Sequence, residues 1–363
     1  MTLSSHTTAT LARPSRLGRF GLEFPFMVAP MVGLSHVAFR RLVRSYTPPS
    51  ARALLFTEML STRKIPNEKL ETTNELKVTP GESLFVPQLL GNEEKYIEPS
   101  VRKLLTLAPF GFDINMGCPV AHTLRHNWGV RLMGDKEYAA DVVRICKRAS
   151  PLPVSVKLRG SGGDGEDLDA LLAFTEALEG GGADWLTVHP RPRAQGHKGD
   201  ANWLLVQEVR RRRSLPGVGN GNVQNADDAL ATYERFEVDG VMIARAATAR
   251  PWILWQIARR LGATDSPEGF TPEQCPETPE EEGREYVRAC LRHLDYLAEA
   301  FSLEEDVLDR FRFFVATGCR WLQFGHAFWK MTTKAKTLAQ LREGVEAFGE
   351  NCVSPMERTV KHL

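Results

Sequence analysis

The sequence lacks several features that would by themselves point to a class of protein. Its six cysteines are scattered and include no C-x-x-C pair, which argues against a zinc site or a disulfide framework and predicts a reducing compartment, the cytoplasm. No apolar run is long enough to span a membrane. The net charge over 363 residues is only +1, so a surface for nucleic acid would have to be local. We expect a monomer with no metal and no membrane contact.

What is present is an ordinary globular composition, 42% hydrophobic and 25% charged, in a chain long enough for one large domain and a smaller one. Residues 1–19 are rich in Ser, Thr and Ala, carry Arg13, Arg16 and Arg19, and contain no acid. This composition is compatible with a transit peptide, but the stretch has no apolar segment of the signal-peptide type. We predict that residues 1–19 form a disordered N-terminal segment.

Short apolar runs alternate with amphipathic stretches over the next part of the chain. The pattern predicts strands at 26–29, 54–57, 84–89, 112–115, 154–158, 185–188, 217–219 and 238–244, and helices at 37–45, 93–107, 137–149, 168–179, 203–213 and 226–233. Such alternation predicts a parallel sheet. Eight strands over about 220 residues favour a closed (β/α)8 TIM barrel over an open doubly wound sheet. We therefore predict an α/β barrel over residues 20–260.

The composition changes after the barrel. Residues 261–281 contain four prolines and many acids, which is typical of a linker. Helical patterns follow at 282–300, 304–317 and 338–348. They predict a second, all-α domain over residues 282–363.

Polar side chains gather where the predicted strands end, which is where the chemistry of a TIM barrel is found. Lys157 follows its strand in alternation with Ser155 and Arg159, and a lysine there can stabilise negative charge on a ligand ring. A strand-end lysine that simply reaches solvent is the alternative. The set of strand-end residues is Pro30, Met31, Val32, Gln88, Asn115, Cys118, Lys157, His189, Arg191, Arg193, Asn220, Gly221, Asn222, Ala244 and Arg245.

The segment 111–119, G-F-D-I-N-M-G-C-P, predicts a buried strand that runs into a tight turn. Gly117 permits the sharp bend and Pro119 stiffens the exit from it. A thiol at this strand end, with the Asn115 amide beside it, suits proton delivery to a bound planar ligand. A buried, inert cysteine that ends a core strand is the alternative.

Two glycine-containing segments match phosphate-binding patterns, and only the first is a candidate phosphate site. The Gly-Asn-Gly-Asn turn at 219–222 and the Ala244-Arg245 strand end lie on the last two strands, whose loops form the usual phosphate site of TIM barrels. The segment 160–165 matches the dinucleotide fingerprint G-x-G-x-x-G. However, Asp184 would open the next strand rather than end it, and the segment belongs to the fifth strand–helix unit. We predict a flexible glycine-rich loop there and not a Rossmann fold.

Seven segments resemble the tRNA-dihydrouridine synthases, in the right order and over roughly residues 20–260 of the chain. The most specific of these segments is N-M-G-C-P. The helical region 282–363 matches that family's RNA-binding domain in placement. The segments are 27–33 (MVAPMVG), 56–59 (FTEM), 86–89 (VPQL), 115–119 (NMGCP), 156–159 (VKLR), 188–196 (VHPRPRAQG) and 218–221 (VGNG).

The resemblance implies an FMN-binding barrel that reduces uridine in tRNA to 5,6-dihydrouridine with NADPH. Cys118 would be the general acid that protonates C5 of the uracil, and Asn115 would contact the target base. The FMN-binding residues implied by the resemblance are Pro30, Met31 and Val32 against the flavin, Gln88 and Lys157 at its pyrimidine edge, His189 near the ring, and Asn220, Gly221, Asn222, Ala244 and Arg245 at the phosphate.

Candidate RNA contacts are basic residues near the mouth of the barrel and in the helical domain. Aromatic residues are interleaved with the second group, a combination that suits RNA, although aromatics at helical spacing more often form a domain core. The residues are Arg191, Arg193 and Lys198, then Arg125 and Arg131, and finally Lys330, Lys334, Lys336 and Arg342 with Trp321, Phe324, Phe328 and Trp329.

The chain departs from the family pattern at several positions. Asn222 stands where an acid is common and Ala244 where glycine is common, and the loops 122–128 and 190–192 are atypical. These changes leave the substrate open, so uridine in ribosomal RNA and a small molecule are alternatives to tRNA. A non-catalytic RNA-binding module is a further alternative, which the joint presence of Cys118, Lys157 and Gln88 disfavours.

Overall fold

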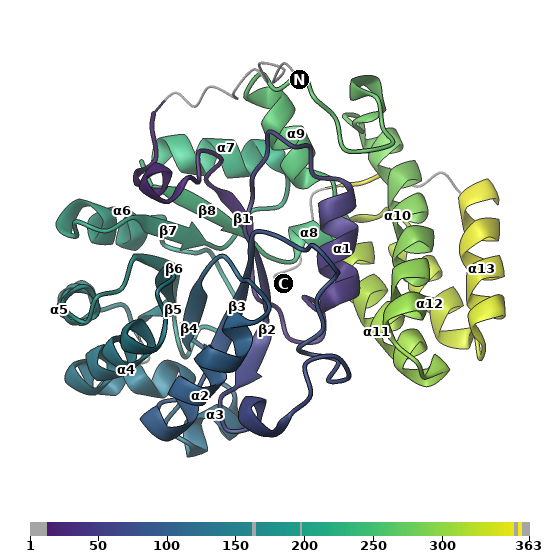
Figure 1. Ribbon diagram of the computed structural model, residues 1–363. Helices are drawn as coiled ribbons and strands as arrows, with labels where there is room; N and C mark the ends of the chain where they lie inside the picture. Colours follow the sequence, from purple (N-terminus) through teal and green to yellow (C-terminus); the bar gives the residue numbers. More distant parts are fainter. Residues whose placement is uncertain (1–12, 162–164, 197, 352–354, 358–363) are drawn as a thin grey trace, which may run out of the picture.

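The computed structural model describes residues 13–161, 165–196, 198–351 and 355–357 (Figure 1). Its larger part is a closed barrel of eight parallel strands, in which β8 pairs back onto β1. The predicted TIM barrel is confirmed. The strands are β1 (Phe26–Val28), β2 (Leu55–Ser61), β3 (Phe85–Leu90), β4 (Phe112–Met116), β5 (Val154–Ser161), β6 (Trp185–Pro192), β7 (Gly217–Asn220) and β8 (Gly240–Ile243).

Helices surround the barrel, and most of them bury one apolar face. In α1, for example, Phe39, Leu42 and Val43 are buried against the strands. Several of these helices begin at a side chain that accepts a backbone N–H, namely Asp135, Asp167, Asn202 and Asn225. The helices are α1 (Val37–Ser45), α2 (Glu94–Leu105), α3 (Ala121–Arg125), α4 (Lys136–Ala149), α5 (Leu168–Gly180), α6 (Trp203–Arg212), α7 (Ala226–Arg235), α8 (Ala246–Ala249) and α9 (Ile253–Arg260).

The barrel interior is a core of its own. Inward-facing side chains from several strands meet there, among them Phe56, Trp185 and Met242. Leu17 and Leu22, which precede β1, belong to the same cluster and close it at the N-terminal ends of the strands. The opposite, C-terminal ends of the strands therefore remain for a ligand.

The predicted disorder at the N-terminus is wrong for residues 13–19. A 3-10 helix, η1 (Arg16–Phe20), begins after Ser15, whose hydroxyl accepts the Leu17 N–H. Arg16 makes a 2.6 Å ion pair with Asp239, which is fully buried beneath the last strand. A buried carboxylate needs such partners, and this requirement fixes the segment. Residues 1–12 lie outside the described residues.

Gly160 and Ser161 of the glycine-rich segment 160–165 are the last residues of β5, and α5 begins at Leu168. A closed eight-stranded barrel excludes the open dinucleotide-binding sheet that the fingerprint would require. Residues 162–164 lie outside the described residues, so the predicted flexibility of this loop stays a prediction.

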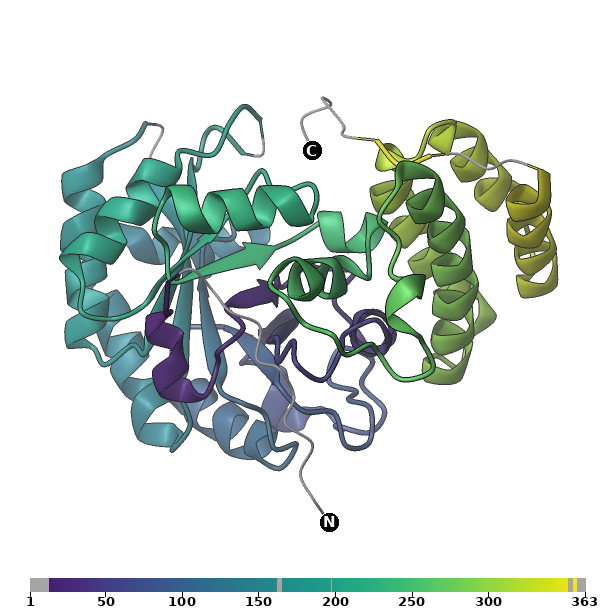
Figure 2. The same cartoon turned by 90° about the horizontal axis from the view of Figure 1, so that it is seen from above.

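The helical domain lies beside the barrel (Figures 1 and 2). It contains α10 (Pro279–Ala300), α11 (Glu304–Gly318), the short η5 (Cys319–Trp321), α12 (Gly325–Lys334) and α13 (Leu338–Asn351). A Thr278–Glu281 capping box starts α10 three residues before the predicted boundary. Trp321 and Phe328 are buried in this domain as core residues, whereas Phe324 is exposed.

The two parts of the molecule are joined by α10, which packs on α1, and by α11, which packs on α8. Glu282 makes a buried ion pair with Arg250, and Glu285 accepts a 2.5 Å hydrogen bond from Tyr46. The segment 261–278 between barrel and α10 contains one 3-10 turn, η4 (Pro272–Gln274). Within the described part of the chain, none of the helices has the length and apolar character needed to cross a lipid bilayer.

Candidate active site

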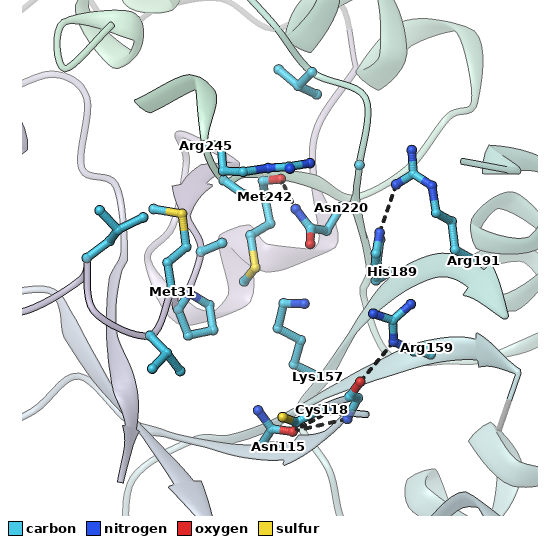
Figure 3. A pocket seen from close by; sticks show the side chains of 18 of the residues that line it. Met31, Asn115, Cys118, Lys157, Arg159, His189, Arg191, Asn220, Met242 and Arg245 are labelled. Carbon is cyan, nitrogen blue, oxygen red and sulfur yellow. Dashed lines mark hydrogen bonds between the residues drawn. The ribbon is translucent and has the colours of Figure 1, made fainter. Parts of the chain in front are cut away.

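A cavity of about 870 Å³ opens at the C-terminal ends of the strands (Figure 3). It gathers every residue predicted for the site except Arg193. The predicted residues that line it are Pro30, Met31, Val32, Gln88, Asn115, Cys118, Lys157, His189, Arg191, Asn220, Gly221, Asn222, Ala244 and Arg245. A volume of this size is within the range of about 300–1,000 Å³ that small-molecule sites occupy.

The turn after β4 places the thiol of Cys118 at the cavity. The side-chain oxygen of Asn115 accepts hydrogen bonds from the backbone N–H of Cys118 at 3.0 Å and of Gly117 at 3.2 Å. Arg159 donates from Nε to the Gly117 carbonyl at 2.9 Å. Cys118 is half-buried and carries a free thiol. Asn115 therefore acts first on the backbone that carries this thiol.

The segment after Cys118 clamps the same turn. The Val130 N–H donates to the Cys118 carbonyl at 3.1 Å, from a 3-10 helix, η3 (Gly129–Gly134). Gly129 has a φ of +60°, and a Cβ there would lie 2.5 Å from that carbonyl oxygen. Only glycine permits this approach, so the thiol is held from both sides of the turn.

A buried acid, Asp113, lies behind the turn and was not among the predicted residues. Its two carboxylate oxygens accept hydrogen bonds from Gln88 at 2.7 Å and Ser155 at 2.6 Å. The Gln88 oxygen in turn accepts from Asn115 at 2.8 Å. Burial raises the pKa of Asp113 to about 7, although these hydrogen bonds and the charge of Lys157 oppose the rise. The only sequence signal was an acid inside an otherwise apolar strand.

Two cations face the cavity without a hydrogen bond or ion pair to any of the described residues: Lys157 and Arg245. Burial lowers the pKa of Lys157 to about 8 while Asp113 opposes that shift. Burial also lowers the pKa of Arg245 to about 10, and the nearby charges of Arg191 and Arg320 add to this. Figure 3 shows Lys157 between the Cys118 side and the Arg245 side of the cavity. Cations held in this way suit a ligand with negative charge at two places.

The end of β7 approaches the cavity closely. Gly221 has a φ of +141°, and a Cβ there would lie 2.9 Å from the Ala201 Cβ. Asn220 donates to the Met242 carbonyl at 2.7 Å, which ties β7 to β8. The turn can therefore bring backbone next to a ligand, beside Arg245 on the next strand end.

The two arginines predicted at the end of β6 differ in their relation to the cavity. Arg191 lines the cavity, but its guanidinium lies 2.9 Å from His189 Nε2, donates at 2.7 Å to the Gly199 carbonyl and also bonds Asn222. Arg191 thus braces the loop from within. Arg193 is half-buried and does not line the cavity. β6 runs to Pro192, farther than predicted, which leaves Arg193 beyond the strand end.

The wall opposite these cations is apolar and includes the helical domain. Met31 is held by Ser35, whose hydroxyl accepts the Met31 N–H at 2.8 Å. The Gly33 N–H donates at 2.9 Å to Glu58, and burial raises the pKa of that carboxyl. Phe313 of α11 lies against Gly33 and lines the cavity. Phe313 carries no sequence signal that links it to the site, because it reaches the cavity through the tertiary arrangement alone.

Fold and site define a (β/α)8-barrel protein. Its ligand cavity combines a thiol, hydrogen-bonded carboxamide side chains and two cations that have no partner among the described residues. Among the described residues no group of three His, Cys, Asp or Glu side chains could hold a metal ion. A model of the dihydrouridine synthase (Dus) family matches residues 27–352. The chain therefore belongs to the dihydrouridine synthase family, and the resemblance of its motifs is confirmed.

Relatives with the family name cover most of the chain. The protein is 32% identical over 247 residues to "Probable tRNA-dihydrouridine synthase 1" of Synechocystis sp., which covers 68% of each chain. It is 30% identical over 290 residues to "Probable tRNA-dihydrouridine synthase" of Rhodobacter capsulatus, over 77% of this chain and 87% of that one. A solved structure of a FabK mutant from Thermotoga maritima aligns with a TM-score of 0.40 at 13% identity, over 66% of this chain and 67% of that one, a likeness too distant to bear on function.

Proposed function

We propose that this protein reduces uridines in tRNA to 5,6-dihydrouridine, with FMN held in the cavity and NADPH as the reductant. Family membership and the names of the relatives support the reaction and its RNA substrate. The observation that carries the mechanism is the thiol of Cys118, held by backbone hydrogen bonds at the edge of a cavity that also exposes Lys157. A proton donor and a cation on one cavity suit reduction of a polarised ring double bond.

The residues present fit FMN. Lys157 and Arg245 lack partners in the described structure, and FMN has an electron-accepting ring and a phosphate that would use both of them. The Gly221 turn would let backbone approach the phosphate beside Arg245. Pro30, Met31 and Val32 would form the wall against the ring, with Gln88 and Lys157 at its polar edge and His189 nearby. When bound, FMN would supply the hydride.

The chain's own residues would orient the reacting groups and supply a proton. Cys118 would donate the thiol proton to C5 of the uracil, opposite the face that receives hydride. Asn115 would keep the thiol in place through the Gly117 and Cys118 N–H groups, and its amide nitrogen has a second hydrogen for the base. Lys157 would stabilise the negative charge that develops on the bound rings. The uridine would have to leave its stack to reach the cavity.

The test is the fate of tRNA incubated with the purified protein. We expect a yellow protein with a flavin spectrum that converts uridine to dihydrouridine, measured by mass spectrometry of the digested tRNA. Cys118→Ala should keep the flavin and slow product formation by about 100-fold or more, the usual contribution of a general acid. Cys146→Ala is the matched control, because this buried thiol of α4 does not line the cavity.

Two outcomes would contradict the proposal at different levels. Product formation by Cys118→Ala at the wild-type rate would remove the acid assignment. If the wild-type protein reduced no uridine in tRNA, tRNA would not be its substrate. Dihydrouridine mapping of ribosomal RNA from a deletion strain would then test ribosomal RNA as the substrate. The monomeric state and the cytoplasmic location remain predictions.

A further inference from the structure

A second cavity, which we call the α1–α10 cavity, lies at the end of the barrel opposite the candidate active site. Its volume is about 700 Å³. Its walls come from the end of α1 and the segment after it, from residues 79–83 before β3, from residues 268–270 and from α10. Segments that run into strands lie at the N-terminal end of a barrel, away from its mouth. Since α1 and α10 lie side by side (Figure 1), both parts of the molecule bound this cavity.

The charges that line the α1–α10 cavity are mostly positive. Four arginines and two glutamates belong to its wall, although the chain as a whole has a net charge of only +1. Glu82 is already neutralised, because it accepts hydrogen bonds from Arg40 at 2.6 and 3.0 Å and from the Thr79 N–H at 3.0 Å. The other acid, Glu268, is exposed. The cavity therefore keeps an excess of positive charge.

Two of the four arginines, Arg44 of α1 and Arg292 of α10, make no ion pair with a carboxylate of the described residues. Arg44 is half-buried and donates to the backbone carbonyls of Ala53 at 3.1 Å and Ser83 at 3.3 Å. Burial is the main reason that the pKa of Arg44 is lowered to about 10. A cation withdrawn from water without a counter-charge favours an anionic partner.

Arg292 is held by two aromatic rings. Its guanidinium carbon lies 4.8 Å from the centre of the Tyr46 ring and 4.9 Å from the centre of the Phe270 ring. In the part of the chain that the structure describes, this guanidinium donates no hydrogen bond. Stacking fixes a guanidinium through its faces and leaves the N–H donors at its edge for a planar or tetrahedral oxyanion.

We propose that the α1–α10 cavity binds a small phosphorylated molecule with at least two negative charges. Arg44 holds the phosphates from the barrel, and Arg292 holds them from the helical domain. The rings of Phe270 and Tyr296, which also line the cavity, contact the rest of the molecule. The volume is within the range of about 300–1,000 Å³ of small-molecule sites, and two such cations are few for a nucleic-acid backbone.

The position of the cavity indicates what such a ligand does. It lies at the other end of the barrel from the thiol of Cys118, so the ligand takes no part in the chemistry there. Because its two cations come from the two parts of the molecule, the bound anion stabilises the contact between them. The inference is independent of the proposed function.

The test is isothermal titration calorimetry of the full-length protein with pyrophosphate and with adenosine diphosphate at constant ionic strength. We expect saturable binding. Arg44→Gln and Arg292→Gln, one on each side of the cavity, should each weaken it by about tenfold or more, because a hydrogen bond to a charged group is lost. Pyrophosphate should also raise the thermal midpoint of the wild type more than that of either variant. Tighter binding of adenosine diphosphate than of pyrophosphate would show that the aromatic rings contribute.

Arg284→Gln is the matched control. Arg284 lies on the same helix, α10, but is exposed and does not line the cavity. Its substitution removes the same charge and should leave both affinities unchanged. Far-ultraviolet circular dichroism checks that each variant folds, and since Arg44 and Arg292 belong to different parts of the molecule, either variant alone can decide the result.

Three results would overturn the inference. The first is that neither probe binds saturably. The second is that folded Arg44→Gln and Arg292→Gln bind as the wild type does, or that Arg284→Gln weakens binding equally, since the anion would then respond to another site or to net charge alone. The third is displacement of pyrophosphate by a tRNA transcript in the wild type but not in Arg292→Gln, which would assign the cavity to a nucleic-acid surface. The dihydrouridine assay reads the opposite end of the barrel and fails or succeeds separately.

Discussion

Asp113 influences the position of the thiol in the cavity through two intervening side chains, Gln88 and Asn115. Its carboxylate fixes which way the Gln88 amide points, because Gln88 must donate to it. The Gln88 oxygen is then free to accept from Asn115, and the Asn115 oxygen can accept from the Cys118 N–H. Each side-chain amide has one oxygen that accepts and one nitrogen that donates. If the Gln88 amide were turned round, the Asn115 amide would therefore have to turn round as well. The position of the thiol is thereby tied to a buried acid that touches no ligand.

We predict that Asp113→Asn slows dihydrouridine formation by about tenfold or more, because an unmet buried hydrogen bond costs about 1–3 kcal/mol. Ser155 donates to one oxygen of residue 113, so the new amide would turn its NH2 group toward the Gln88 donor. The measurement is the single-turnover rate with saturating tRNA. Ser155→Ala is the control, since it removes one hydrogen-bond donor to Asp113 and leaves the orientation of the Gln88 amide intact. It should slow the reaction less than Asp113→Asn does. Equal rates for Asp113→Asn and wild type would show that the chain does not position the thiol.

At the scale of elements, α10 and α1 pack together around two histidines. His293 of α10 is fully buried and stacks on His36, the N-cap of α1, with ring centroids 5.8 Å apart. Burial lowers the pKa of both, to about 3 for His293, and the neighbouring His293 and Arg310 lower that of His36 further. Both rings are therefore neutral in the folded protein at neutral pH. Protonation would place charge inside the contact between the barrel and the helical domain.

The expected consequence is a loss of stability in weak acid. A histidine whose pKa is depressed by folding stabilises the protein fully above its unfolded value of about 6.5, and the contribution falls as pH drops toward the folded value. For His293 this amounts to about 2 kcal/mol between pH 7 and pH 5. Urea unfolding at the two pH values measures it. His293→Leu should reduce the pH dependence, whereas His122→Ala, at an exposed position of α3, should not.

The elements also explain what could be predicted from the sequence. The strand-end residues were found because a closed parallel barrel brings all C-terminal strand ends to one mouth, whatever their exact bounds. Arg193 follows the end of β6 at Pro192 and does not line the cavity, and its contact with the substrate stays a prediction. The order at residues 13–19 depends on Asp239, more than 200 residues away, which no local pattern can indicate. The place of Phe313 in the cavity wall could not be predicted from a local pattern either, since only the docking of α11 brings it there.

For the whole molecule, the decisive feature is that the helical domain forms part of the cavity wall. Phe313 and Thr317 come from α11, so the cavity is complete only when the helical domain is docked. The docking depends on Glu282 of α10, which accepts from Arg250 at 2.9 Å and from Gln256 at 2.9 Å and is buried. The site is therefore sensitive to changes at a contact that is remote from its chemistry.

Glu282→Ala should destabilise the protein by about 3–5 kcal/mol, because it leaves the Arg250 guanidinium buried without its counter-charge. Urea unfolding followed by flavin fluorescence and by far-ultraviolet circular dichroism measures the effect. We expect coincident transitions by both probes in the wild type, since the cavity wall spans both parts, and separated transitions in the variant. Glu280→Ala, in the same first turn but on the exposed side of α10, is the matched control and should leave both curves unchanged. A variant with wild-type stability and coincident transitions would mean that apolar packing between α10 and α1 is sufficient to hold the helical domain against the barrel.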